Sequence, residues 1–243
     1  MLGSMLGLVF ALLAAIFIGS SQATLRKSYD TFPPSVAFFF DALFGLLIWA
    51  PLAVYMGISG MVDWRSAFVF AVISAILSEA IVFYALSKGA LAITATVLAT
   101  YPIYTIFFSR LFNGETLSLI LKLFVGIAIL GSILASYPVK AESGSRVSKG
   151  CFWPFIAAVS IGLSDALSKH YINRSQDFSF LFALAFVQLP VAVAYLRLEK
   201  QSLRQAWSEL SGGLKKYQSA LLGGLFNIVG TGFLWLSFSY APA

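Results

Sequence analysis

Charged residues, cysteine and histidine are all scarce in this sequence of 243 residues. Charged residues make up 11% of the chain, which has one cysteine, Cys151, and one histidine, His170. One cysteine cannot form an internal disulfide, and a Cys/His metal site needs three or four ligands. The sequence therefore predicts no internal disulfide, no metal site and no cofactor.

Hydrophobic residues take the place of the missing charge, at 59% of the chain with a mean hydropathy of +0.88. A water-soluble domain needs more polar surface than this to cover its outside. The net charge of +6, in so apolar a chain, is typical of basic loops that face anionic lipid. It does not indicate a nucleic-acid surface, because basic patches with interleaved aromatic residues are absent. We therefore predict a multi-pass protein of the cell membrane that contacts lipid and has no nucleic-acid partner.

Apolar runs that could cross a bilayer can be counted directly, because a helix needs ~20 residues to span ~30 Å of hydrocarbon. Eight runs have this length, and they cover residues 5–25, 35–58, 66–86, 91–111, 117–137, 152–171, 178–196 and 217–240. The sequence thus predicts an all-α integral membrane fold. The polar stretch 139–150 is the best linker, and Leu and Trp at helical spacing in 197–216 predict a short helix on the membrane surface.

A repeat appears when residues 14–26 are set over residues 157–169, where six of thirteen positions are identical. A weaker match, at a shift of 152 residues, places the third apolar run over the eighth. Five helices are an odd number of crossings, so a second five-helix repeat would enter from the opposite side of the membrane. We therefore predict inverted repeats, a first one over 1–143 and a second, incomplete one over 150–243.

The stretch from Phe83 to Ser118 has an aromatic-Ala-Leu helix end, a small-residue helix with a central proline, and the run Gly-Glu-Thr-Leu-Ser. This pattern resembles the EamA-like branch of the drug/metabolite transporter superfamily. The resemblance implies inverted five-helix repeats, ten helices in all, and a secondary transporter or exporter of amino acids, related metabolites or drugs. Only eight helices are found, so we expect the chain to be truncated after the eighth. Lys88 aligns with Tyr240, and the first repeat continues for 139 − 88 = 51 residues, so a full protein would end near residue 240 + 51 = 291.

Polar and aromatic side chains inside the predicted helices are the candidates for a substrate cavity, because buried polar groups in a membrane need a partner or a pathway. Gln22 and Asp165 occupy equivalent repeat positions, and helix 8 carries residues at four-residue spacing that align with helix 3. The full candidate set is Gln22, Glu79, Phe83, Tyr101, Asp165, Asn227, Thr231 and Trp235. An interhelical hydrogen bond is the alternative role for Asn227, and close helix packing is favoured over cavity lining for Ser21 and Ser164.

Glu79 is the candidate for coupling transport to protons. At ~1.5 Å per residue it lies within ~5 Å of the middle of its helix, where a carboxyl group loses its hydration. The positions one helical turn away are all apolar, so a protonated Glu79 could donate to Asn227, Thr231 or Tyr101. The alternative is a neutral glutamate in a fixed interhelical hydrogen bond. Lys88, Lys169 and His170 end their helices and are expected to extend to the interface.

Other function classes have weaker support. The sequence contains no HExxH, no G-x-S-x-G and no phosphate-binding loop, which argues against an enzyme and against ATP-driven transport by this chain alone. A structural, enzymatic or channel-like membrane protein remains the alternative to a carrier of small molecules. A homodimer is compatible with the sequence.

Overall fold

The computed structural model describes residues 2–58, 63–88, 91–116, 118–135, 152–172, 177–202, 204, 214–238 and 240. Regular structure within these residues is entirely helical, so the predicted all-α integral membrane fold is confirmed. Its elements are α1 (Leu2–Ser28), α2 (Pro34–Met56), α3 (Trp64–Ser74), the π-helix η1 (Ala75–Ala80), α4 (Ile81–Lys88), α5 (Leu91–Leu98), α6 (Tyr101–Asn113), α7 (Leu119–Ala135), α9 (Phe152–Ile172), α10 (Asp177–Leu198) and α12 (Leu214–Phe238).

Each of the eight predicted apolar runs is helical, with two departures from a plain α-helix. The third run changes to π-helical hydrogen bonding at Ala75–Ala80, and the fourth is broken at Ala99 and Thr100. Pro102 lies in the first turn after this break and cannot donate the backbone hydrogen bond that would continue one helix. The linker 139–150, and residues 203 and 205–213 of the stretch predicted as a surface helix, lie outside the described residues.

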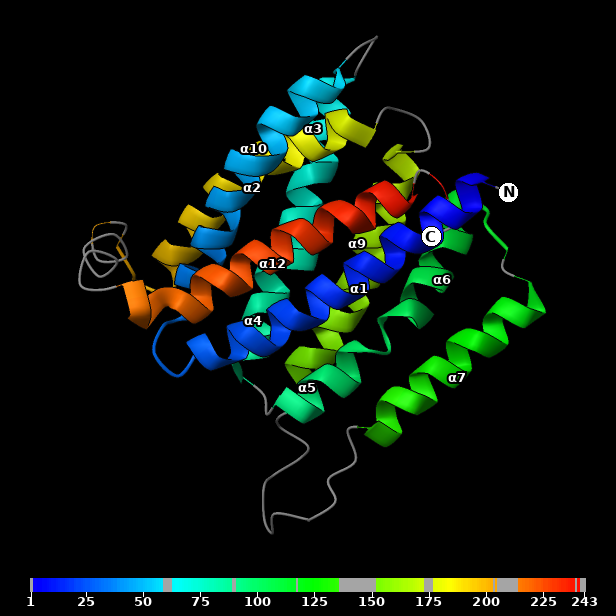
Figure 1. Cartoon of the computed structure of the whole chain (residues 1–243), viewed down its shortest axis with the longest axis horizontal. Coiled ribbons are helices and arrows are strands. Elements are labelled where there is room, and N and C mark those ends of the chain that lie inside the picture. Colours follow the sequence, from blue (N-terminus) through cyan, green and yellow to red (C-terminus); the bar gives the residue numbers. More distant parts are fainter. Residues whose placement is uncertain are drawn as a thin grey trace.

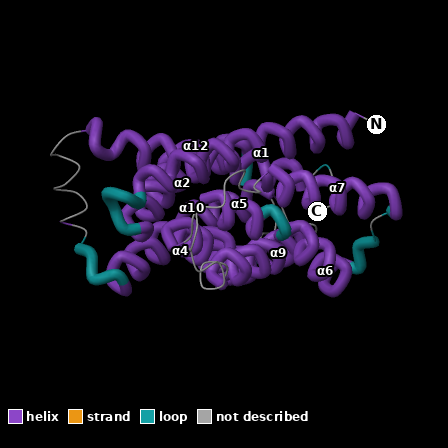
Figure 2. Tube along the Cα trace, turned by 90° about the horizontal axis from the view of Figure 1, so that it is seen from below, coloured by secondary structure: helices purple, strands orange, loops and turns teal. Residues whose placement is uncertain are grey.

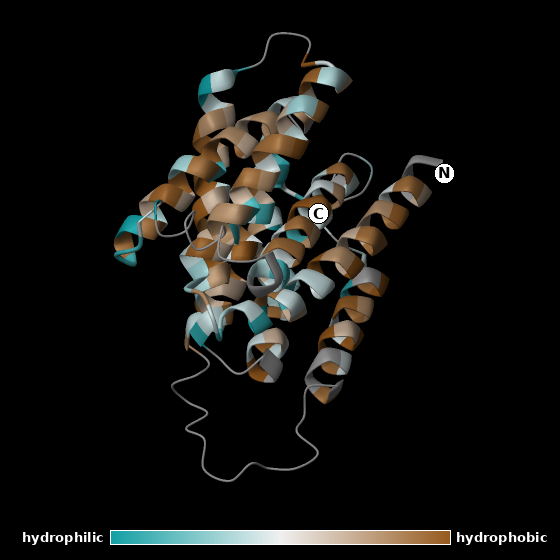
Figure 3. Ribbon diagram, turned by 60° about the vertical axis from the view of Figure 1, so that its left-hand side comes forward, coloured by the Kyte–Doolittle hydropathy of each residue, from teal (hydrophilic) through white to brown (hydrophobic). Residues whose placement is uncertain are grey.

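Five helices in the described part of the chain are long and apolar enough to cross a membrane. They span Met5–Ser28, Pro34–Met56, Trp64–Lys88, Phe178–Leu198 and Tyr217–Ser237. Apolar residues extend along most of each helix in Figure 3. Large apolar side chains also face outward, as on α7, where Leu134 is 75% exposed. This surface suits lipid, since hydrocarbon does not penalise an exposed apolar side chain as water does.

Local polar groups and a glycine cap the helix ends. The Asp63 carboxylate caps α3 by accepting a hydrogen bond from the Ser66 backbone N–H at 3.2 Å, and hydrogen bonds from Ser66 lower the pKa of Asp63. Glu199, just after α10, accepts the Ser35 N–H at 3.1 Å and so serves the first turn of α2. Gly114 ends α6 with φ at +67°, in the left-handed region that glycine adopts without strain.

Two helix pairs carry the residues that the sequence repeat sets over each other. α1 packs along α12, and α9 packs along α6 and also contacts α3, η1 and α4. The pair formed by α1 and α12 is visible across the centre of Figure 1, and Figure 2 shows the same two helices adjacent from below. The equivalent serines serve equivalent pairs, because Ser21 Oγ donates to Gly223 O at 2.8 Å and Ser164 Oγ donates to Ser74 Oγ at 3.0 Å.

Glycine allows the closest helix contacts. A methyl group at Gly162 of α9 would lie 2.6 Å from the Thr105 backbone nitrogen on α6, which is closer than real Cβ contacts. At Gly230 of α12 it would lie 2.9 Å from the backbone nitrogen of Ile18 on α1. Gly19, the repeat equivalent of Gly162, has no atom within 4 Å of such a methyl group. The same repeat residue is therefore a packing contact in one half only.

This difference makes Gly162→Ala and Gly19→Ala a matched pair. Gly162→Ala should destabilise the protein by about 1–3 kcal/mol, because overpacking must push α6 away from α9. Gly19→Ala should be neutral or stabilising by up to ~1 kcal/mol, since alanine is the better helix former. Thermal unfolding in one detergent measures both, and equal shifts in the two variants would contradict the described contact.

Candidate functional site

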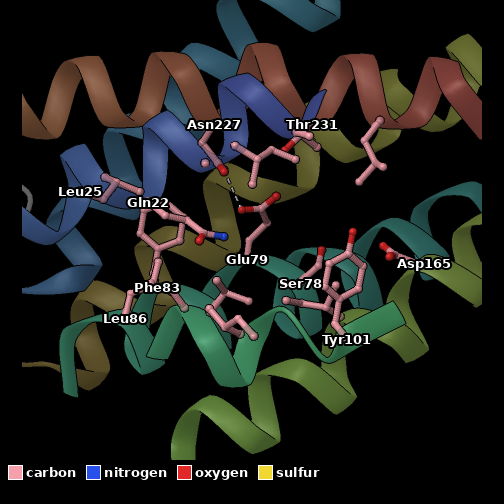
Figure 4. Close-up of a pocket in the computed structure, with 18 of the residues that line it drawn as sticks. Gln22, Leu25, Ser78, Glu79, Phe83, Leu86, Tyr101, Asp165, Asn227 and Thr231 are labelled. Atoms are coloured by element: carbon pink, nitrogen blue, oxygen red, sulfur yellow. Dashed lines mark hydrogen bonds between the residues drawn. The ribbon is translucent and has the colours of Figure 1, made fainter. Parts of the chain in front are cut away.

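A cavity of about 500 Å³ lies between the helices and is lined from α1, η1, α4, α5, α6, α9 and α12. Figure 4 shows its polar side chains pointing inward from several of these helices. The structure brings all the sequence-predicted candidates to this one cavity. They are Gln22, Glu79, Phe83, Tyr101, Asp165, Asn227, Thr231 and Trp235.

Two interruptions of α-helical geometry border the cavity. Ala99 and Tyr101 line it at the break between α5 and α6. The backbone N–H groups in the first turn of α6 have no acceptor within α6 itself. Ser78 and Glu79 line it from the π-helix η1. Single π turns inside α-helices are frequent at functional sites, because the extra residue turns the following side chains to a new direction.

Asn227 of α12 is the centre of the polar contacts. Its side-chain Nδ2 donates to Glu79 Oε2 at 3.0 Å and to Asp41 Oδ1 of α2, also at 3.0 Å. Figure 4 shows the bond to Glu79 as a dashed line. Glu79 is 5% exposed and Asp41 is fully buried. Both predicted roles of Asn227 therefore apply, since it lines the cavity and forms interhelical hydrogen bonds.

Asp41 is the polar residue that the sequence reasoning missed. It does not line the cavity, but it shares Asn227 with Glu79. The signal was an acidic residue within the apolar run 35–58, where charge is costly and marks a functional site by default. The repeat alignment offered no partner for this position, and its contact with Asn227, 186 residues away, exists only in the folded chain.

Asp165 lies at another part of the cavity wall, on α9. It is 2% exposed, and its Oδ2 accepts a hydrogen bond from Thr105 Oγ1 at 3.5 Å. Tyr101, one helical turn before Thr105, lines the cavity from the same helix. Ser21 and Ser164, in contrast, do not line the cavity and bond across helix interfaces, as the packing interpretation predicted.

No Lys, Arg or His is among the described residues that line the cavity. Lys88 Nζ lies 4.9 Å from the centre of the Tyr84 ring, and His170 Nδ1 lies 2.8 Å from Asn113 Oδ1 of α6. The prediction that Lys169 extends to the interface is wrong, because its side chain is only 4% exposed. Asn113 of α6 forms hydrogen bonds with Ala166 and His170, so α6 packs against this end of α9, which an isolated helix would leave open.

Aromatic side chains form the apolar part of the wall and are held from behind. Phe83 packs on Phe38 of α2, with ring centres 5.2 Å apart, and Trp235 packs on Phe180 of α10 at 5.3 Å. Both lining rings are nearly fully buried. A mostly apolar wall with a few placed polar groups is the usual composition of a small-molecule site.

Comparison with known proteins agrees with this architecture. The EamA-like transporter family matches residues 5–137, more than half of the chain. The chain belongs to the EamA-like transporter family. A protein of Archaeoglobus fulgidus, described as an uncharacterized transporter, is 29% identical over 199 residues, which are 79% of this chain and 67% of that relative. The protein is thus a multi-pass membrane transporter of the drug/metabolite kind.

Thiol labelling can distinguish a water-filled cavity in this EamA-like protein from its lipid-facing surface. Ala15 lines the cavity, whereas the next residue, Ile16, is 64% exposed and does not. In a Cys151→Ser background, Ala15→Cys should react with a small charged thiol reagent about tenfold faster than Ile16→Cys, because the thiolate needs water to form. The two positions have nearly the same depth on α1, so equal labelling rates would contradict an aqueous cavity.

Proposed function

We propose that this protein is a secondary transporter or exporter of small metabolites, which bind in the cavity and cross the membrane by alternating access. The observation that carries the proposal is the convergence of residues from both predicted repeats, 1–143 and 150–243, on one cavity. Transporter sites commonly lie at the repeat interface, near interrupted helices. The break between α5 and α6 and the π turn at Glu79 agree with that position.

Two observations support related contacts on the two sides of the interface between the predicted repeats. Ser21 and Ser164, which align in the sequence repeat, form hydrogen bonds to equivalent helices of opposite repeats. The pairing of α1 with α12 likewise matches the pairing of α9 with α3, η1 and α4. Alternating access would rearrange these contacts between the repeats and expose the cavity on alternate sides.

The cavity chemistry favours a substrate with hydrogen-bond donors, such as an amine, over an anion. Glu79 and Asp165 supply carboxyl oxygens, and no described lining residue supplies a positive side chain. Aromatic rings at Phe83, Tyr101 and Trp235 offer faces that attract cations. Amino acids, related metabolites and amine drugs fit this description.

Uptake and counterflow of a metabolite panel in vesicles that contain the protein test this substrate class. Failure of every amine in the panel to compete for transport would contradict it.

Glu79→Gln tests the proposed role of Glu79 in proton coupling. Glutamine keeps the size and a hydrogen bond to Asn227 but cannot bind and release a proton. The variant should lose accumulation driven by a pH gradient and keep exchange of substrate across the membrane. Flux of labelled substrate with and without an imposed gradient measures the two activities. If the variant keeps the wild-type response to the gradient, Glu79 is structural, and Asp165→Asn is the next variant to test.

A further inference from the structure

Asn227 holds two carboxyl groups with one amide nitrogen. Asp41 Oδ1 and Glu79 Oε2 each lie 3.0 Å from Asn227 Nδ2, so these oxygens cannot be more than 6.0 Å apart. An amide nitrogen has two N–H bonds, one for each carboxyl. The three side chains come from α2, η1 and α12, and the bridge therefore joins three helices.

The donors around this pair are too few for two negative charges. An ionised carboxylate can accept about four hydrogen bonds, and Asn227 supplies one to each acid. Asp41 Oδ2 is buried and has no hydrogen-bond partner in the described part of the chain. Asp41 is fully buried, so water cannot supply the missing donors as it does at a surface. A second charge on the pair would lack both solvation and a counter-ion among the described residues.

Charged and titratable groups on the neighbouring helices do not neutralise the pair. On the cavity side the titratable groups are Tyr101 of α6 and Asp165 of α9, and α1 contributes only the neutral Gln22. On the other side, Asp41 interacts electrostatically with Tyr29. The other charged or titratable neighbours of Tyr29 are Arg26, Tyr195 and Glu199. Arg26 is paired with Asp30 at 3.4 Å. Lys169 is buried one turn beyond Asp165, outside the cavity lining.

We propose that Asp41, Asn227 and Glu79 form one proton-binding site, in which one of the two acids is protonated and the other is ionised. The proton enters and leaves through Glu79, because Glu79 lines the cavity and Asp41 does not. Binding converts one carboxylate to a carboxylic acid, and release returns the proton to water in the cavity. This inference deepens the proposed coupling role of Glu79 and rests on it for its place in transport.

Close backbone packing fixes the position of Asp41 in this site. A methyl group at Gly224 of α12 would lie 3.3 Å from the Cα and the backbone nitrogen of Asp41. Gly224 precedes Asn227 by three residues and therefore lies on the same helix face. α2 and α12 approach closely at this glycine, so Asp41 cannot withdraw far from the Asn227 amide. The two acids are consequently held close together whether the site is protonated or not.

Infrared spectroscopy of the protein in lipid tests the proposal without a transport assay. The carbonyl stretch of protonated carboxyl groups is measured at neutral and at strongly acid pH. The isosteric double variant Asp41→Asn/Glu79→Gln supplies the baseline, which removes the contribution of Asp165. The wild-type band above this baseline should be about half as large at neutral pH as at acid pH, where both acids are protonated.

The single variants decide between a coupled pair and two independent acids. The band is followed as the pH rises. In Asp41→Asn and in Glu79→Gln the remaining acid has no charged neighbour, so its proton should leave at a lower pH than the second proton of the wild-type pair. Asp63→Asn, at an exposed carboxyl before α3, is the matched control and should leave the wild-type steps unchanged. Wild-type steps that coincide with those of the two single variants would overturn the pair, as would a wild-type band that disappears when Na⁺ replaces choline.

The infrared and flux results separate two failures. If the band behaves as expected while Glu79→Gln keeps its response to a pH gradient, the proton site stands and the coupling role of Glu79 is wrong. If the wild-type steps coincide with those of the single variants, the shared site is wrong whatever the flux shows. Asn227→Leu adds an independent check, because loss of both N–H donors should protonate both acids and raise the neutral-pH band about twofold.

Discussion

The bilayer supplies no hydrogen-bond partners, and this constraint organises the interior of the protein. A polar side chain within the helices must find a hydrogen-bond partner inside the protein or face an internal cavity. Asn227 meets the requirement for two acids at once, by donating to Asp41 and to Glu79. Ser21, Ser164 and Thr105 meet it by hydrogen bonds across helix interfaces. The same polar contacts that satisfy these groups also join the helices around the cavity.

Close helix packing and the cavity depend on each other. Small residues such as Gly162 and Gly230 let backbones approach, because no side chain separates the helices there. Larger side chains then gather at the neighbouring level, where Phe83 and Trp235 pack against rings from α2 and α10. The bundle is therefore tight at Gly162 and Gly230, whereas Gly19 lines the cavity and has no atom within 4 Å of an added methyl group.

Irregular backbone occurs where the polar groups gather. The π turn at Ala75–Ala80 contains Glu79, and the break at Ala99 and Thr100 precedes Tyr101. Backbone groups freed by such interruptions are tolerated at membrane depth when they are buried in protein or face a water-filled cavity. Both interruptions border the cavity of this EamA-like transporter. The binding site and the backbone irregularities thus belong to one structural feature.

The sequence by itself determined where the helices lie, because ~20 apolar residues are needed to cross the bilayer wherever the chain does so. The sequence patterns also named eight candidate residues, from Gln22 to Trp235, which are among the twenty that line the cavity. Only the tertiary structure decided that Asp41 meets Asn227, that Lys169 is buried, and that helix 3 contains a π turn. These features depend on which helix faces approach one another. That choice is made by packing between residues far apart in the chain, and no local periodicity encodes it.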